Sequence, residues 1–138
     1  MSNNNVHHPV GALVAMVKTI IKCVQEYKAK LVINPDIKFD FGNCILRSTK
    51  SYIIGGIGGC LPDKLEPSNI LGPNHRQFAH SLVAAAGLNY INLKMKHSET
   101  NELLKECFDD LVIGYNSHLI LDSFTPKALP VIGIKLNG

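Results

Sequence analysis

Cysteine is scarce in this sequence, and its spacing excludes one common kind of small metalloprotein. None of the four cysteines belongs to a C-x-x-C pair, so a structural zinc ribbon is not expected. The N-terminus "MSNNNVHHPVG" has no basic region before an apolar core and does not resemble a secretory signal. We therefore expect a cytoplasmic, reducing location and buried free thiols. These thiols are Cys23, Cys44, Cys60 and Cys107.

Long apolar runs and strong net charge are also lacking. No uninterrupted apolar stretch reaches the ~18–20 residues that a membrane-spanning helix needs. The net charge of +3 comes without a long basic run, which argues against a dedicated DNA-binding surface. Hydrophobic residues make up 46% of the 138 residues, which suits one folded domain over residues 1–138. Peripheral membrane contact stays open, because the first expected helix has apolar and lysine-bearing sides.

Helical periodicity dominates what is present and predicts an all-α fold. The first expected helix runs from Pro9 to Leu31, with proline in the first position. The second covers about Ser48–Cys60, where four glycines require tight packing by neighbours, and a buried strand is the alternative. After a loop over residues 61–74, a third helix begins near His75, and the fourth covers residues 101–124. We expect a compact helical domain of four or more helices.

The fourth helix carries a histidine and a carboxylate at helical spacing. His118 and Asp122 are four residues apart and share one face, about 5–6 Å apart at Cβ. Leu111 and Gly114 lie along the same side, so this face is expected to point inward. Burying both groups without partners is costly. A metal ion answers that need, and a His–Asp hydrogen bond capped by backbone groups is the alternative.

The stretch "HRQFAHS" brings two more histidines close together. His75 at the helix entry and His80 one turn in can converge on one pocket. Arg76 lies between them, and its planar guanidinium can donate two parallel hydrogen bonds to a phosphate. Ser81 can orient a ligand. The alternative is a polar helix start with Arg76 in solvent.

Two further groups add carboxylates and imidazoles. Asp63 and Glu66 lie in the proline-bounded turn "LPDKLEP", where an exposed carboxylate is the alternative and fits Glu66 better. His7 and His8 precede Pro9; His8 can reach inward, and a disordered end is the alternative for both. Imidazole and carboxylate ligands suit zinc, manganese or iron. Two such ions can clamp the attacking and leaving oxygens of a phosphoester.

Three of these segments, taken in order, resemble a known family. "LPD", "HRQFAHSL" and "GYNSHLILDSFTPKALP" are similar to the YdjM-like proteins, LexA-regulated and inner-membrane-associated metal-dependent hydrolases. The family pattern is a histidine near the N-terminus, then L-P-D-x-D-H-P, H-R-G-x-T-H-S-L and G-Y-x-S-H-x-x-x-D-x-x-T-P-x-G-x-P. The match covers about residues 55–130. Leu65 and Glu66 stand where the family has its second aspartate and its next histidine.

The resemblance implies a ligand set and a reaction. The implied metal ligands are His8, Asp63, His75, His80, His118 and Asp122. The family is thought to be related to the zinc-dependent phospholipase C and single-strand nuclease superfamily, an all-α fold with a three-metal cluster. The resemblance thus implies one to three divalent ions, zinc first and manganese or iron as alternatives, and phosphoester hydrolysis.

The leading hypothesis is a metal-dependent phosphodiesterase acting on a nucleotide, nucleic acid or phospholipid. Asp63 would help to hold the metal that activates water, Arg76 would stabilise charge on the phosphoryl oxygens, and Glu66 is the candidate base. The alternative is a non-catalytic, metal-stabilised or membrane-associated interaction protein. A helical domain without metal is the third possibility.

Overall fold

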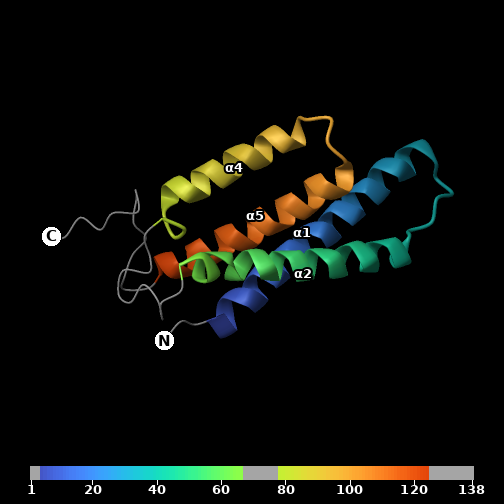
Figure 1. Ribbon diagram of the computed structural model, residues 1–138. Coiled ribbons are helices and arrows are strands. Elements are labelled where there is room, and N and C mark those ends of the chain that lie inside the picture. The colour runs from blue at the N-terminus through green and yellow to red at the C-terminus, as the bar shows by residue number, and fades with distance from the viewer. Residues whose placement is uncertain (1–3, 67–77, 125–138) are drawn as a thin grey trace.

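Four helices make up most of the described chain (Figure 1). The computed structural model describes residues 4–66 and 78–124. The helices are α1 (Asn4–Ile33), α2 (Phe41–Leu65), α4 (Leu82–Lys96) and α5 (Glu102–Ser123). Helices α1, α2 and α5 pack against one another, and α4 packs against α5. Since the described ranges contain no strand, the all-α prediction is confirmed for them.

The first helix begins earlier than predicted. It starts at Asn4, so Pro9 lies inside it and not at its first position. Proline lacks a backbone N–H and here removes one hydrogen bond close to the helix end, where several N–H groups have no helical acceptor in any case. The extra turn brings His7 and His8 into the helix, which excludes the alternative of a disordered end for both.

The second and third helices also differ from the prediction at their ends. Helix α2 includes the glycine-rich segment, which excludes the strand alternative, and it continues through Leu65 into the predicted loop. Helix α4 begins at Leu82 and not near His75, because the Ser81 side chain caps it by accepting from the Ala84 N–H. The predicted bounds of the fourth helix agree with α5 to within one residue.

Glycines allow α1, α2 and α5 to approach at backbone distance. A Cβ atom on Gly11 would lie 2.7 Å from the carbonyl oxygen of Gly55 and 3.3 Å from the Cα of Gly114. A Cβ on Gly59 would lie 2.7 Å from the carbonyl oxygen of His7. A methyl group at these positions would push the helices apart, so the predicted tight packing of the glycine-rich helix is confirmed.

The interior is rich in polar side chains, while apolar side chains cover much of the outside. The fully buried groups include His80, His118 and Asp122. The apolar positions that predicted α1 face outward; they are 38–52% exposed, and small residues face the core instead. The outward residues are Leu13, Val14, Val17, Ile20, Ile21 and Val24, and the inward ones are Gly11, Ala12, Ala15, Thr19 and Cys23.

Ion pairs join the helices in the half of the bundle away from the chain termini. Lys18 of α1 donates to Asp110 and Asp109 of α5, at 2.5 Å and 2.9 Å. Ser51 of α2 donates to the second oxygen of Asp110 at 2.6 Å. The lysine-bearing side of α1 therefore packs against acidic groups. Among the described helices, none combines the length and the hydrophobicity needed to cross a membrane.

All four cysteines are free thiols, as predicted. Their burial differs from the expectation. Cys23 is buried, and the other three are half-buried.

Candidate metal centre

The candidate site lies where four segments meet at one end of the bundle (Figure 1). His7 comes from the first turns of α1, and Asp63 from the last turn of α2. His80 comes from the turn before α4, and His118 and Asp122 from the last turns of α5. The start of α1, the end of α2, the turn before α4 and the end of α5 lie at the same end of the bundle, so residues from 7 to 122 meet there.

Four ligand atoms converge in this cluster. The Nε2 atoms of His80 and His118 are 3.3 Å apart. Asp63 Oδ1 lies 3.3 Å from Nε2 of His80 and 3.8 Å from that of His118. Asp122 Oδ2 lies 3.7 Å and 3.3 Å from the same two atoms. Ligands held at ~2.0–2.2 Å around a tetrahedral zinc are ~3.3–3.6 Å apart, so Asp63, His80 and His118 have nearly the spacing that one ion requires. His118 also belongs to a second group of this kind, with His7 and Asp122.

Hydrogen bonds at the far side of each ring orient both histidines for metal binding. The carbonyl oxygen of Gly59 accepts from Nδ1 of His118 at 2.7 Å, so the lone pair of the neutral ring is on Nε2. A carboxylate oxygen of Glu66 accepts from Nδ1 of His80 at 3.1 Å and has the same effect there. Two imidazole lone pairs and two carboxylates repel one another unless a proton or a cation lies between them. The donor set therefore fits a divalent cation.

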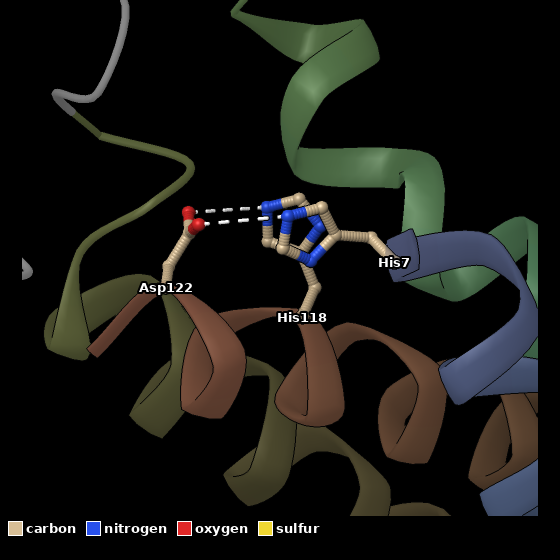
Figure 2. Close-up of side chains that lie close together, drawn as sticks. All are labelled: His7, His118 and Asp122. Atoms are coloured by element: carbon tan, nitrogen blue, oxygen red, sulfur yellow. Dashed lines mark ion pairs between the residues drawn. The ribbon is translucent and has the colours of Figure 1, made fainter. Parts of the chain in front are cut away.

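His7 adds a third imidazole to the cluster and lies beside His118, on the same side of Asp122 (Figure 2). Its Nε2 atom lies 3.7 Å from Asp122 Oδ1, while Asp122 Oδ2 faces His118 and His80. The rings of His7 and His118 pack against each other at a tilt of 32°, with centroids 4.1 Å apart. The two oxygens of Asp122 thus face different histidines, which is the arrangement of a carboxylate able to bridge two neighbouring ions.

Electrostatics and a tyrosine hold the turn that carries His80. Burial by itself lowers the pKa of His80, but hydrogen bonds to Asp63 and Glu66 outweigh it, and the pKa is raised. The Tyr115 hydroxyl donates to the carbonyl oxygen of Ala79. Burial, with Glu66 nearby, raises the pKa of Tyr115 to about 12, so this group stays a donor. The turn is therefore fixed from both sides.

The structure brings together four of the six predicted ligands and leaves out one. The four are Asp63, His80, His118 and Asp122. His8 is exposed, and its ring lies against Gly56 and not in the cluster. His75 and Arg76 lie outside the described residues.

His7 is the residue of the candidate site that the sequence analysis did not select. Its signal is a spacing of four residues: His7, Gly11 and Ala15 recur along one side of α1, and this small side is the one that faces the core. His8 belongs to a neighbouring side. Placing the helix start at Pro9 hid this pattern, because it put both histidines outside the helix.

Glu66 and Ser81 have positions that differ from those expected. The Glu66 side chain is only 12% exposed, so an exposed turn carboxylate is the wrong description. One of its oxygens accepts from His80 and the other accepts from the Phe78 N–H at 2.6 Å. Ser81 is buried and caps α4. Both residues fix His80, and a role of Glu66 as base stays a prediction.

Comparison with known proteins identifies one relationship. A family model described as "YdjM inner membrane protein" matches residues 7–136. No curated protein matches the chain, and no solved structure does. The likeness to the phospholipase C and nuclease superfamily therefore stays a prediction.

Proposed function

The chain belongs to the YdjM inner membrane protein family, and we propose that it is a metal-dependent phosphoester hydrolase that works at a membrane. One observation carries the proposal. Two buried imidazoles, turned by Gly59 and Glu66, direct their Nε2 atoms toward the same space as the carboxylates of Asp63 and Asp122. The family description favours membrane association, and a cytoplasmic-side location follows from our expectation for the thiols.

The proposed first ion is held by Asp63, His80, His118 and Asp122. Nitrogen and oxygen ligands at this spacing favour zinc, with manganese or iron as alternatives. A second ion would be held between His7 and Asp122 Oδ1. The family resemblance implies that His75 is also a ligand, and it stays a candidate for that second ion.

In this proposal, residues of the chain hold the ion, orient the imidazole ligands and contact the phosphoryl group. A divalent ion with such ligands lowers the pKa of a water molecule toward neutrality and polarises a phosphoryl oxygen. Glu66 and Gly59 hold the two imidazoles in the protonation state that binds metal. We expect Arg76 to stabilise negative charge on the phosphoryl oxygens, since its guanidinium suits them.

The competing function is a non-catalytic, metal-stabilised interaction protein. The observation that favours it is structural: the cluster joins the ends of α1, α2 and α5, so an ion there would also stabilise the fold. Replacing Asp63 by alanine separates the two functions. A hydrolase loses activity and keeps most of its melting temperature, whereas an interaction protein mainly loses thermal stability.

The deciding experiment is elemental analysis of protein purified without a histidine tag. We expect stoichiometric zinc, manganese or iron in the wild type and its loss in the variant His118→Ala/Asp122→Ala. The control is His97→Ala/Asp36→Ala, which removes an exposed histidine and an exposed aspartate and should keep the metal. A wild type that carries and takes up no metal, with a melting temperature indifferent to chelator, would contradict the proposal.

A further inference from the structure

A groove between α1 and α5 starts beside the candidate metal centre. It encloses about 320 Å³ and is lined mainly by apolar side chains. These are Val10 and Val14 of α1 and Ile113, Ile120 and Leu121 of α5. Val10 lies one helical turn from His7, and Leu121 directly precedes Asp122. An apolar chain in this groove would therefore lie within about one turn of the metal ligands.

Exposed apolar side chains also lie close along the chain to the residues of the cluster. Leu65 is 61% exposed and adjoins Glu66, and Phe78 is 67% exposed two residues before His80. Phe124 is 83% exposed two residues after Asp122. Large apolar groups placed in water around a polar site mark a surface that meets lipid or protein. Each of these three apolar residues lies two positions from a proposed ligand: Leu65 from Asp63, Phe78 from His80 and Phe124 from Asp122.

Four cations of the bundle are paired with carboxylates of the protein itself. Lys18 is paired with Asp109 and Asp110. Lys22, Arg47 and Lys50 all contact Glu106. These cations are neutralised within the protein, whereas binding of a polyanion depends on unneutralised lysine and arginine.

We infer that the substrate of the proposed site is a membrane phospholipid, with an acyl chain in the α1–α5 groove and its phosphoester at the metal centre. This inference rests on the proposed hydrolase function and narrows it to one substrate class. The apolar outer side of α1, with Val14 and Val17 44% and 49% exposed, continues from the groove and faces the bilayer from which the lipid comes. Hydrolysis forms one P–O bond to the oxygen of a water molecule and breaks the P–O bond to the leaving alcohol, whose oxygen takes up a proton from that water, so no further reactant is needed.

Two assays on zinc-loaded protein test the inference separately from the proposed function. One follows hydrolysis of bis(4-nitrophenyl) phosphate, a soluble diester without an acyl chain. The other follows, by phosphorus NMR, hydrolysis of phosphatidylglycerol with six-, seven- and eight-carbon chains and of vesicles of phosphatidylglycerol and phosphatidylethanolamine. We expect kcat/KM to rise about two- to fourfold for each methylene that the groove takes from water.

The groove variant is Val14→Gln/Ile120→Gln, which changes two partly exposed residues of its lining. We expect it to lose the chain-length dependence, to hydrolyse vesicle lipid about tenfold more slowly and to keep its activity on the soluble diester within about twofold. The matched control is Ile45→Gln at the other end of α2, where the isoleucine is 65% exposed, and it should change neither activity.

Each other result has a definite meaning. Hydrolysis of the soluble diester without hydrolysis of phospholipid, or without dependence on chain length, overturns the inference and leaves the proposed function intact. Equal loss of both activities in a groove variant that keeps the wild-type melting temperature also overturns it, because the groove then has no specific part in lipid hydrolysis. If zinc-loaded wild type hydrolyses neither class, the proposed function fails and the inference fails with it.

Discussion

Replacing His7 and His8 one at a time distinguishes the site in the structure from the site expected from sequence. The two residues are adjacent and chemically identical, but His7 is buried against His118 and Asp122 while His8 is exposed. The variants His7→Ala and His8→Ala therefore form a matched pair. Each removes one imidazole from the second turn of α1, and only one of them touches the cluster.

The structure sets the expected magnitudes. His7→Ala removes a ring packed 4.1 Å from that of His118 and one partner of the fully buried Asp122 carboxylate. Such a loss costs about 1–3 kcal/mol. For a domain of this size, that corresponds to a fall in melting temperature of ~3–10 °C. An exposed substitution such as His8→Ala should change the free energy of unfolding by about 0.5 kcal/mol or less.

The assay is a zinc titration against a competing chromophoric chelator, with thermal unfolding followed on the same samples. We expect His7→Ala to lower the affinity for zinc by about tenfold or more; if two zinc ions bind, this loss applies to the more weakly bound one. His8→Ala should leave the affinity within about twofold of the wild-type value. If His8→Ala has the larger effect on affinity, His8 is the ligand and the face assigned to the first turns of α1 is wrong. If neither variant affects metal binding, the cluster ends at His118 and Asp122.

Three further predictions follow from the packing and the charges. Gly114→Ala should destabilise the protein by about 1–3 kcal/mol, because the new Cβ would overlap the backbone of α2. Gly87→Ala is the control: a Cβ there meets nothing within 4 Å, so the change should stabilise the protein by about 0.5–1 kcal/mol. Chemical denaturation measures both. Glu66→Gln should weaken zinc binding about 10- to 100-fold and leave the circular dichroism spectrum unchanged, since it removes the charge that orients His80; an unchanged affinity would contradict that role. Burial by itself raises the pKa of Asp109, but hydrogen bonds from lysines and an asparagine outweigh that effect and lower the pKa from 3.8 to about 2. The stabilising contribution of the Asp109 carboxylate is therefore complete above pH ~4 and is lost as the pH falls toward 2. The melting temperature of Asp109→Asn should therefore depend less on pH over that range, and equal slopes for both proteins would refute this.

The sequence was sufficient for features that depend on neighbours along the chain. Helical spacing predicted α5 to within one residue and placed His118 and Asp122 on one inward face, because residues four apart on a helix share a side whatever surrounds them. The glycines of α2 predicted close helix packing for a similarly local reason, since the lack of a side chain is a property of the residue itself.

Only the tertiary structure decided which side of α1 faces inward. The apolar residues there predict a helix correctly, but they do not predict its orientation, because the interior of this bundle is built from small and polar groups and the apolar side is left outside. That choice selects His7 over His8. The packing of α2 against the turn before α4 likewise decided between the alternatives for Glu66, because it makes the Glu66 carboxylate a mostly buried partner of His80 and not an exposed turn carboxylate. A contact of this kind depends on the packing of whole helices, which local sequence patterns do not determine.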